Sequence, residues 1–105
     1  MLRIYSVALD VAETVGRLAR SVRQHDPDLA RQMTRAASSV PLNPAEGSGT
    51  RGGNRRLRYQ TARGSAMEVR ACIELAERLQ FVEPLGAVER EKLKHVISAL
   101  HMLAR

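Results

Sequence analysis

Arginines are the residues of this chain whose types and spacing most clearly suggest a chemical role. Five of them, with no acidic residue among them, stand between Gly47 and Met67: Arg51, Arg55, Arg56, Arg58 and Arg63. A guanidinium donates charge-assisted and often bidentate hydrogen bonds to phosphate. We therefore predict that this segment binds a polyanion, with RNA or DNA as the first candidate.

The charge of the whole chain agrees with this prediction. Its 17 basic residues, of which 15 are arginines, outnumber 11 acidic residues and give a net charge of +6. A basic balance of this kind favours polyanionic partners. The chain has only three aromatic residues, Tyr5, Tyr59 and Phe81, so it lacks the stacking platform of single-strand-binding proteins. Contacts to phosphate, without sequence-specific reading, are the expected mode.

A glycine-rich stretch, 47–52, has the glycine spacing of a phosphate-binding loop. In such a loop a Lys and then a Ser or Thr follow the last glycine, and a strand precedes the first. Here Gly53-Asn54 stands in place of that pair, and no strand pattern comes before it. We therefore do not assign nucleotide binding to this stretch.

The histidines and the cysteine offer no catalytic or metal site. His95 and His101 are six residues apart on one expected helix and do not share a face, and His25 lies far from both in the sequence. No cysteine or acidic cluster completes a ligand set for a metal. Cys72 falls on an apolar stripe, where we expect it in the core. The prediction is a protein without enzymatic activity, metal or cofactor.

Four helical patterns and no strand pattern organise the chain. The first has apolar residues at spacings of three and four, with charged residues opposite, which indicates an amphipathic helix of about six turns. Its apolar face consists of Ile4, Ala8, Val11, Val15, Leu18 and Val22. Residues 1–105 are predicted to form a single all-α domain.

The second helix is predicted to begin at Pro27. Asp26 is a good capping residue, and proline is favoured at the first helical position. Its apolar face is formed by Leu29, Met33, Ala36, Ala37 and Val40. Pro41 and Pro44 lack the amide hydrogen that a helix needs, so the residues alone predict that this helix ends near Ser39.

The remaining elements follow from turn residues and periodicity. A polar, glycine-rich loop is expected over residues 47–54, and a third helix over about 55–80. Glu83-Pro84-Leu85-Gly86 forms the next turn, and a fourth helix spans about 87–103. Its expected buried set is Leu93, Val96, Ile97, Leu100 and Leu103.

The third helix has more apolar surface than one core needs. One stripe consists of Leu57, Thr61, Gly64, Cys72, Leu75 and Leu79. A second stripe, about a third of a turn away, consists of Ala62, Val69, Ile73 and Ala76. Because a helix in a monomeric bundle needs an apolar arc only somewhat wider than 100°, we predict a homo-oligomer with the second stripe at the subunit interface.

Two residues near the first stripe of this helix are unfavourable there unless they contact another part of the protein. Gly64 in mid-helix costs about 1 kcal/mol relative to alanine, which close approach of another backbone would offset. Glu68 lies on the same side as Leu57 and Leu75, where burial of an unpaired charge would be expensive. We consider Arg35 as its partner in a structural polar cluster, with a chemical role and simple exposure as the alternatives.

Chain length and cysteine content indicate the expected stability and cellular compartment of the protein. A chain of 105 residues buries only about 60 to 70% of its unfolded surface, so association would help to stabilise it. The single cysteine, Cys72, excludes an internal disulfide and suits a reducing compartment. We find no apolar run long enough to span a membrane and no convincing signal peptide, so a cytoplasmic location is expected.

Two motifs in the chain resemble those of the small four helix bundle protein family. The first is Q-x-x-R-A-A-x-S-V-x-x-N-x-A-E-G at residues 32–47, and the second is G-S-x-x-E-(L/V) at residues 64–69. This family includes the protein encoded in intervening sequences of bacterial large-subunit ribosomal RNA genes. It also includes the accessory variability protein of diversity-generating retroelements.

The resemblance implies an antiparallel up-down four-helix bundle that assembles as a pentamer. It implies that helix 2 continues to Glu46, and a proline at the position of Pro41 is familiar in the family, whereas Pro44 departs from it. Arg35, Asn43, Glu46 and Glu68 lie within the two motifs, so the resemblance supports grouping them in one polar cluster.

Two functional classes remain open. In the first, the protein is a basic, oligomeric accessory protein that associates with RNA or DNA through its arginines. In the second, it is an interaction or scaffolding bundle that docks an acidic protein partner or, by resemblance, a reverse transcriptase. A third interpretation is that the arginines only solubilise the surface. The sequence does not decide among them.

Overall fold

The computed structural model describes residues 3–47 and 53–105, and these form four α-helices. The helices are α1 (Arg3–Arg23), α2 (Pro27–Gly47), α3 (Gly53–Arg78) and α4 (Ala87–Leu103). No strand occurs within the described ranges. The predicted all-helical class and the predicted four helices are therefore confirmed.

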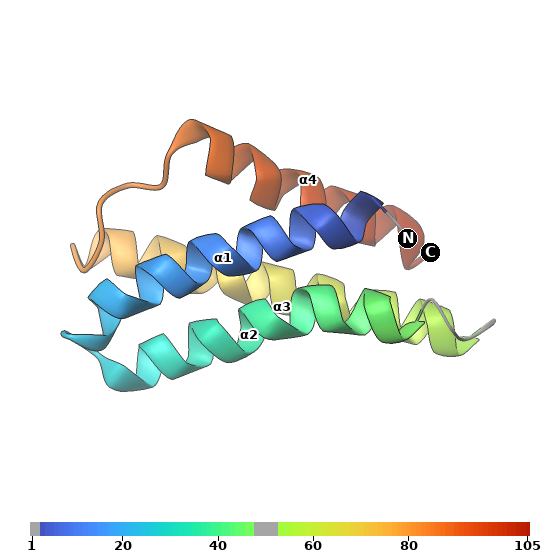
Figure 1. The fold of residues 1–105 in the computed structure, drawn as a ribbon, viewed down its shortest axis with the longest axis horizontal. Helices are drawn as coiled ribbons and strands as arrows, with labels where there is room; N and C mark the ends of the chain where they lie inside the picture. Colours follow the sequence, from blue (N-terminus) through green and yellow to red (C-terminus); the bar gives the residue numbers. More distant parts are fainter. Residues whose placement is uncertain (1–2, 48–52) are drawn as a thin grey trace.

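The four helices lie side by side in an elongated body of 42 × 26 × 19 Å. Figure 1 shows the chain passing along α1, back along α2, along α3 and back along α4. Each helix packs against its two neighbours in a ring, with the most extensive contacts between α2 and α3 and between α1 and α2. The chain termini, the end of α2 and the start of α3 all lie at the same end of the body (Figure 1).

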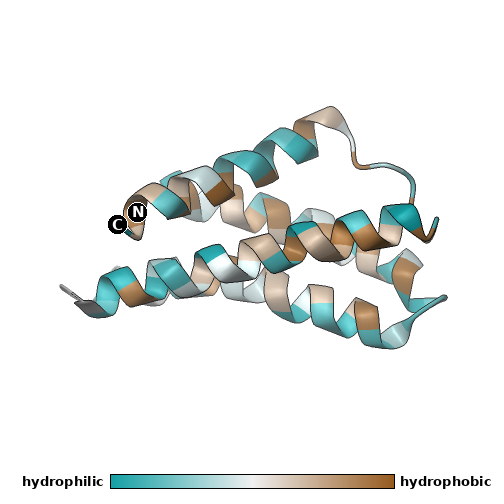
Figure 2. Ribbon diagram, turned by 180° about the vertical axis from the view of Figure 1, so that it is seen from behind, coloured by the Kyte–Doolittle hydropathy of each residue, from teal (hydrophilic) through white to brown (hydrophobic). Residues whose placement is uncertain are grey.

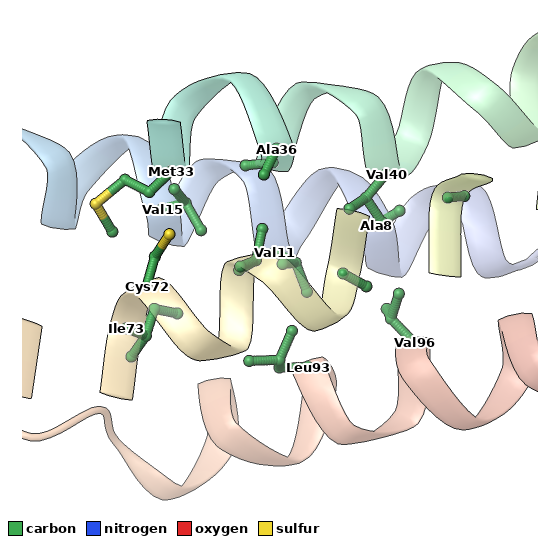
Figure 3. Packing of buried hydrophobic residues seen from close by; sticks show 14 of the residues in the cluster. Ala8, Val11, Val15, Met33, Ala36, Val40, Cys72, Ile73, Leu93 and Val96 are labelled. Atoms are coloured by element: carbon green, nitrogen blue, oxygen red, sulfur yellow. The ribbon is translucent and has the colours of Figure 1, made fainter. Parts of the chain in front are cut away.

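The core runs along the axis between the helices and is built largely from small side chains. Alanines and valines such as Ala8, Val11, Ala36 and Val96 point inward from three of the helices (Figure 3). Of the predicted face of α1, five residues are buried and Leu18 is half-buried. The apolar face predicted for α2 is buried throughout. None of the described helices has both the length and the apolar character needed to cross a membrane.

The start of α2 is as predicted. The Asp26 carboxylate accepts a hydrogen bond from the backbone N–H of Leu29, with Oδ1 and N separated by 3.0 Å. This bond satisfies one of the amide groups left unpaired at a helix N-terminus. Pro27 is the first helical residue, where its missing amide hydrogen costs nothing.

The end of α2 corrects the prediction made from the residues alone. The helix does not stop near Ser39 but continues through Pro41 and Pro44 to Gly47. Both prolines are buried against the bundle, and burial of their rings offsets the backbone hydrogen bonds that they remove. Within the same stretch, Asn43 Nδ2 donates to the Ser39 carbonyl at 3.0 Å. The expectation drawn from the family resemblance is correct here.

The end of α3 has a left-handed residue that is not glycine. Gln80 has a φ of 62°, its N–H donates to the Glu77 carbonyl, and the Phe81 N–H donates to the Ala76 carbonyl. This pair of bonds is the Schellman motif, in which the left-handed position is usually glycine because a Cβ is disfavoured there. The Phe81 side chain then packs against the core.

Gln80→Gly should therefore stabilise the protein, by up to about 1 kcal/mol, because glycine adopts a positive φ without steric cost. Gln60→Gly in the interior of α3 is the matched control, and it should destabilise by at least about 1 kcal/mol, because it lowers helix propensity and also removes the hydrogen bond from Gln60 Nε2 to the Ala104 carbonyl. Chemical denaturation of both variants measures these changes. A lower unfolding free energy for Gln80→Gly would contradict the strain assigned to this position.

The two apolar stripes of α3 occupy the opposite places from those predicted. Ala62, Val69, Ile73 and Ala76 are at most 3% exposed in the single chain, so they belong to its own core and are not available as an oligomer interface. Of the other stripe only Cys72 is buried, while Leu57, Thr61, Gly64, Leu75 and Leu79 are exposed. The prediction that the subunit interface is formed by Ala62, Val69, Ile73 and Ala76 was therefore wrong.

The core face of α4 was predicted with one error. Leu93, Val96 and Leu100 are buried and Ile97 is half-buried. Leu103 is instead exposed, although Leu100 in the same turn is buried. Ala104, which follows the helix, takes the buried position at this end.

Candidate nucleic-acid interface

The predicted arginine segment lies mainly on the first turns of α3. Arg55, Arg56 and Arg58 are exposed there, whereas Arg63 is half-buried. Arg51 lies outside the described residues. Three of the five predicted arginines therefore present guanidinium groups at the surface of one helix end.

Contacts to the protein distinguish these arginines from one another. Arg58 Nη1 donates to Asn43 Oδ1 at 3.4 Å, which links the start of α3 to α2. The Nε of Arg63 is shielded from solvent and has no hydrogen-bond partner among the described residues. Arg63, which is half-buried, is thus less suited to bind an external anion than the exposed Arg55, Arg56 and Arg58.

The helix end itself adds to the positive field of this surface. The first turn of α3 contains no acidic residue, although acidic residues are favoured at a helix N-terminus. Positive side chains there add to the partial positive charge of the unpaired N–H groups. This arrangement is slightly unfavourable for the isolated helix and attractive to phosphate.

The fold adds two arginines that the sequence analysis missed. Arg3 begins α1 and Arg105 follows α4, and both helix ends lie at the end of the bundle where α3 begins (Figure 1). Gln60 Nε2 donates to the Ala104 carbonyl at 3.5 Å, which ties the end of α4 to α3. The available signal was that no acidic residue occurs in the first nine or the last fourteen residues.

We call this part of the molecule the basic end, and it carries the net charge of the protein. Its basic residues are Arg3, Arg55, Arg56, Arg58, Arg63 and Arg105, together with Arg51, which the chain places between α2 and α3. Glu46 is the one acidic residue in these sequence segments. The other ten basic residues are matched by ten acidic ones, so the net charge of +6 corresponds to the basic end alone.

Several acidic residues elsewhere form ion pairs. Lys92 Nζ lies 3.2 Å from Asp10 Oδ2, and Arg90 Nη2 lies 3.1 Å from Glu77 Oε2. Glu77 also accepts a hydrogen bond from the backbone N–H of Leu85 at 2.7 Å. Charges of both signs therefore offset one another over the rest of the surface.

The predicted polar cluster does not form within one chain. Glu68 is exposed rather than buried, and it accepts a hydrogen bond from Gln32 Nε2 at 3.1 Å. Arg35 is also exposed and forms no ion pair with Glu68. Asn43 bonds instead to Ser39 and Arg58, and the Glu46 side chain lies outside the described part. The buried pair predicted for Arg35 and Glu68 was therefore wrong.

Arg35 and Glu68 nevertheless line the same groove. It has a volume of about 570 Å³ and runs between α2 and α3. Its lining residues are Asp28, Arg31, Gln32, Arg35, Ala36, Ser39, Ser65 and Glu68. Ser65 Oγ donates to Ser39 Oγ at 2.8 Å across this groove.

The other residues considered for chemistry occupy structural positions. Cys72 is buried in the core as predicted, and burial, with a smaller contribution from the nearby Glu68 charge, raises the pKa of its thiol. His25 stacks on Phe81, with ring centroids 4.7 Å apart. Among the described residues, no group of three or more potential ligands could hold a metal ion.

Comparison with known proteins agrees with the observed fold. The sequence profile described as 23S rRNA-intervening sequence protein matches residues 1–102 of this chain. No curated protein matches it. The structure is similar to a crystal structure of a protein of unknown function from the S23 ribosomal protein family of Bacteroides thetaiotaomicron. The TM-score is 0.79 at 16% sequence identity, over 97% of this chain and 98% of the other.

Proposed function

We propose that this chain, which belongs to the 23S rRNA-intervening sequence protein family, is a non-enzymatic accessory protein that associates with RNA through its basic end. In this proposal it acts in the cytoplasm as a homo-oligomer of antiparallel up-down bundles. The name of the family refers to ribosomal RNA, and this supports RNA over DNA as the first substrate to test.

The segregation of charge is the observation that carries this proposal. A surface that only needed solubility would have its arginines spread among acidic residues, as the rest of this molecule has. Here Arg55, Arg56 and Arg58 lie together on the first turns of α3. The start of α1, with Arg3, and the end of α4, which Arg105 follows, lie at the same end of the bundle (Figure 1). A local excess of cations over anions attracts phosphate backbones and increases their association rate.

The proposed contact is to phosphates and not to bases. Tyr59 is buried in the core, and Phe81 is engaged with His25 at the other end of the bundle. Tyr5, two residues after Arg3 in the first turn of α1, is half-buried, so the described basic end offers one partly accessible ring and not the row of aromatic side chains on which single strands stack. Phosphate contacts position a nucleic acid without reading its sequence.

Assembly is proposed from the exposed side of α3. Leu57, Leu75 and Leu79 are 48 to 58% exposed in the single chain, and they lie on one side of the helix. A second copy would cover this side, and a pentamer is the state that the family resemblance implies. A ring of copies would repeat the basic end once in each subunit, and several repeats would strengthen binding to one polyanion.

A salt titration tests the proposal. Wild-type protein should bind duplex RNAs of unrelated sequence with similar affinity, and the logarithm of the binding constant should fall linearly with the logarithm of salt concentration. The expected slope is about 0.7 to 0.9 for each phosphate neutralised. Fluorescence anisotropy between about 50 and 200 mM salt measures both. Absence of binding at the lowest salt concentration would refute the proposal.

A second candidate function, docking of an acidic protein, is favoured by a cleft between α3 and α4. The cleft has a volume of about 230 Å³, and apolar side chains of Ile73, Leu85 and Leu93 line it beside Arg70, Arg90, Lys94 and Glu74. An apolar site with cations beside it suits an acidic amphipathic segment. By resemblance, a reverse transcriptase is another partner to consider. Co-purification of an acidic protein that Leu85→Asp releases would support this function.

A further inference from the structure

We propose that Arg35 of one copy pairs with Glu68 of a second copy, so that the polar groove between α2 and α3 is completed only in the assembly. This inference rests on the homo-oligomer of the proposed function. It assigns the two residues to a site between subunits, and it does not depend on RNA binding.

The residues around Glu68 form a regular stripe on the outer side of α3. Successive members are four, three, four, three and four residues apart: Leu57, Thr61, Gly64, Glu68, Ala71 and Leu75. All six are exposed in the single chain. In Figure 2 α3 lies in front, and apolar segments alternate with polar ones along it. Alternate spacings of four and three are the pattern by which one helix packs along another.

The middle of this stripe is open to a close neighbour. A Cβ placed on Gly64 would meet no atom within 4 Å, so nothing in the same chain requires glycine at this position. Ala71, the next member of the stripe after Glu68, is also small and exposed. Two small residues flanking Glu68, with Leu57 and Leu75 beyond them, allow a second backbone to approach most closely at the centre.

The charges of the groove indicate that the second backbone belongs to another copy. Arg31 pairs with Asp28 inside the groove, whereas Arg35 has no ion pair among the described residues. Within the same part of the chain, the one hydrogen-bond partner of Glu68 is the neutral side chain of Gln32. Each copy therefore offers one unpaired cation and one carboxylate on the same surface. Such a surface is complementary to itself in charge.

Burial would make this complementarity necessary. In the single chain, water solvates Glu68 and Arg35, and neither charge needs a partner. A second copy that covers Leu57 and Leu75 would remove water from Glu68 between them, and an unpaired buried charge is strongly unfavourable. Pairing with Arg35 of the neighbour removes that penalty and also fixes the register of the two copies.

Charge reversal in two separate variants tests the pairing. We expect Glu68→Arg and Arg35→Glu each to weaken assembly at least about 100-fold, because like charges then face one another across the interface. Light scattering coupled to size exclusion measures the mass over a range of concentrations. Both positions are exposed in the single chain, so circular dichroism should report unchanged helix content.

Mixing the two variants distinguishes pairing between copies from pairing within one. If the pair forms between copies, the carboxylate introduced by Arg35→Glu meets the guanidinium introduced by Glu68→Arg. The mixture then regains assembly through the junctions between unlike variants, although each variant alone does not assemble. In a ring of five, one junction between like variants remains. If the pair forms within a chain, each subunit keeps two like charges and the mixture stays dissociated. Failure of the mixture to assemble would overturn the proposal, as would assembly of both variants alone.

Gly64→Gln supplies an independent test of the close approach, with Gly16→Gln on α1 as its control. A Cβ at either glycine would have no contact within 4 Å, and both changes improve helix propensity. Only Gly64→Gln should dissociate the assembly. A wild-type mass of one chain at all concentrations would overturn this inference, whereas the salt titration would still decide RNA binding.

Discussion

Replacing Arg55, Arg56 and Arg58 by glutamine should weaken RNA binding about 1,000-fold at about 50 mM salt. Each phosphate contact contributes a slope of about 0.7 to 0.9 in the logarithm of salt concentration, which corresponds to about tenfold in affinity at that concentration. Three contacts multiply to about three orders of magnitude. At about 200 mM salt the same variant should lose less, because the contribution of each contact shrinks as salt rises.

A matched control separates the position of these charges from their number. Arg17, Arg20 and Arg23 on α1 are also exposed, and their replacement by glutamine removes the same net charge away from the basic end. This control should retain nearly all of the wild-type affinity. Both variants should keep wild-type helix content by circular dichroism. Equal losses in the two variants would show that net charge, and not the basic end, governs binding.

Sequence reasoning located this surface only in part. The run from Arg51 to Arg63 was visible because it is continuous in the chain and contains no acidic residue. The contribution of Arg3 and Arg105 depends on the fold, which brings the first turn of α1 and the last turn of α4 to the end of the bundle where α3 begins (Figure 1). Proximity of residues so far apart in the chain is a property of topology and not of local pattern.

The length of α2 exposed a limit of local rules. Proline disfavours the interior of a helix because it lacks a donor and clashes with the preceding turn, and by that rule α2 would end near Ser39. The rule does not include what the ring gains from burial, and Pro41 and Pro44 are both buried. The family resemblance was correct on this point because related chains share the packing that buries this segment, and a local rule does not include packing.

Periodicity revealed two stripes on α3 but could not say which one faces inward. Large residues such as Leu57 and Leu75 would suit a core by their hydrophobicity, and yet they are exposed. The core takes Ala62 and Ala76 instead, beside alanines of α1 and α2. Small residues let helices approach closely, and only the neighbouring helices decide where that approach occurs. The same error placed Glu68 inside the chain.

Two neighbouring residues of α3 should therefore respond in opposite ways to the same substitution. Ile73 is 3% exposed and Leu75 is 48% exposed. Ile73→Glu places an unpaired carboxylate in the core and should destabilise the fold by roughly 3 to 5 kcal/mol. For a domain of this size that corresponds to a fall in melting temperature of more than about 12 °C.

Leu75→Glu should leave the single chain folded but abolish its assembly. Exposed substitutions usually change stability by less than about 0.5 kcal/mol, whereas a carboxylate at position 75 would place an additional charge, two helical turns from Glu68, in the apolar part of the contact. Because dissociation itself lowers an apparent melting temperature, both variants should be compared with the dissociated Gly64→Gln protein at one concentration. Circular dichroism then measures folding, and light scattering measures mass. If the Ile73→Glu protein kept its fold and only dissociated, the subunit interface would have to lie on the stripe that contains Ile73, as first predicted.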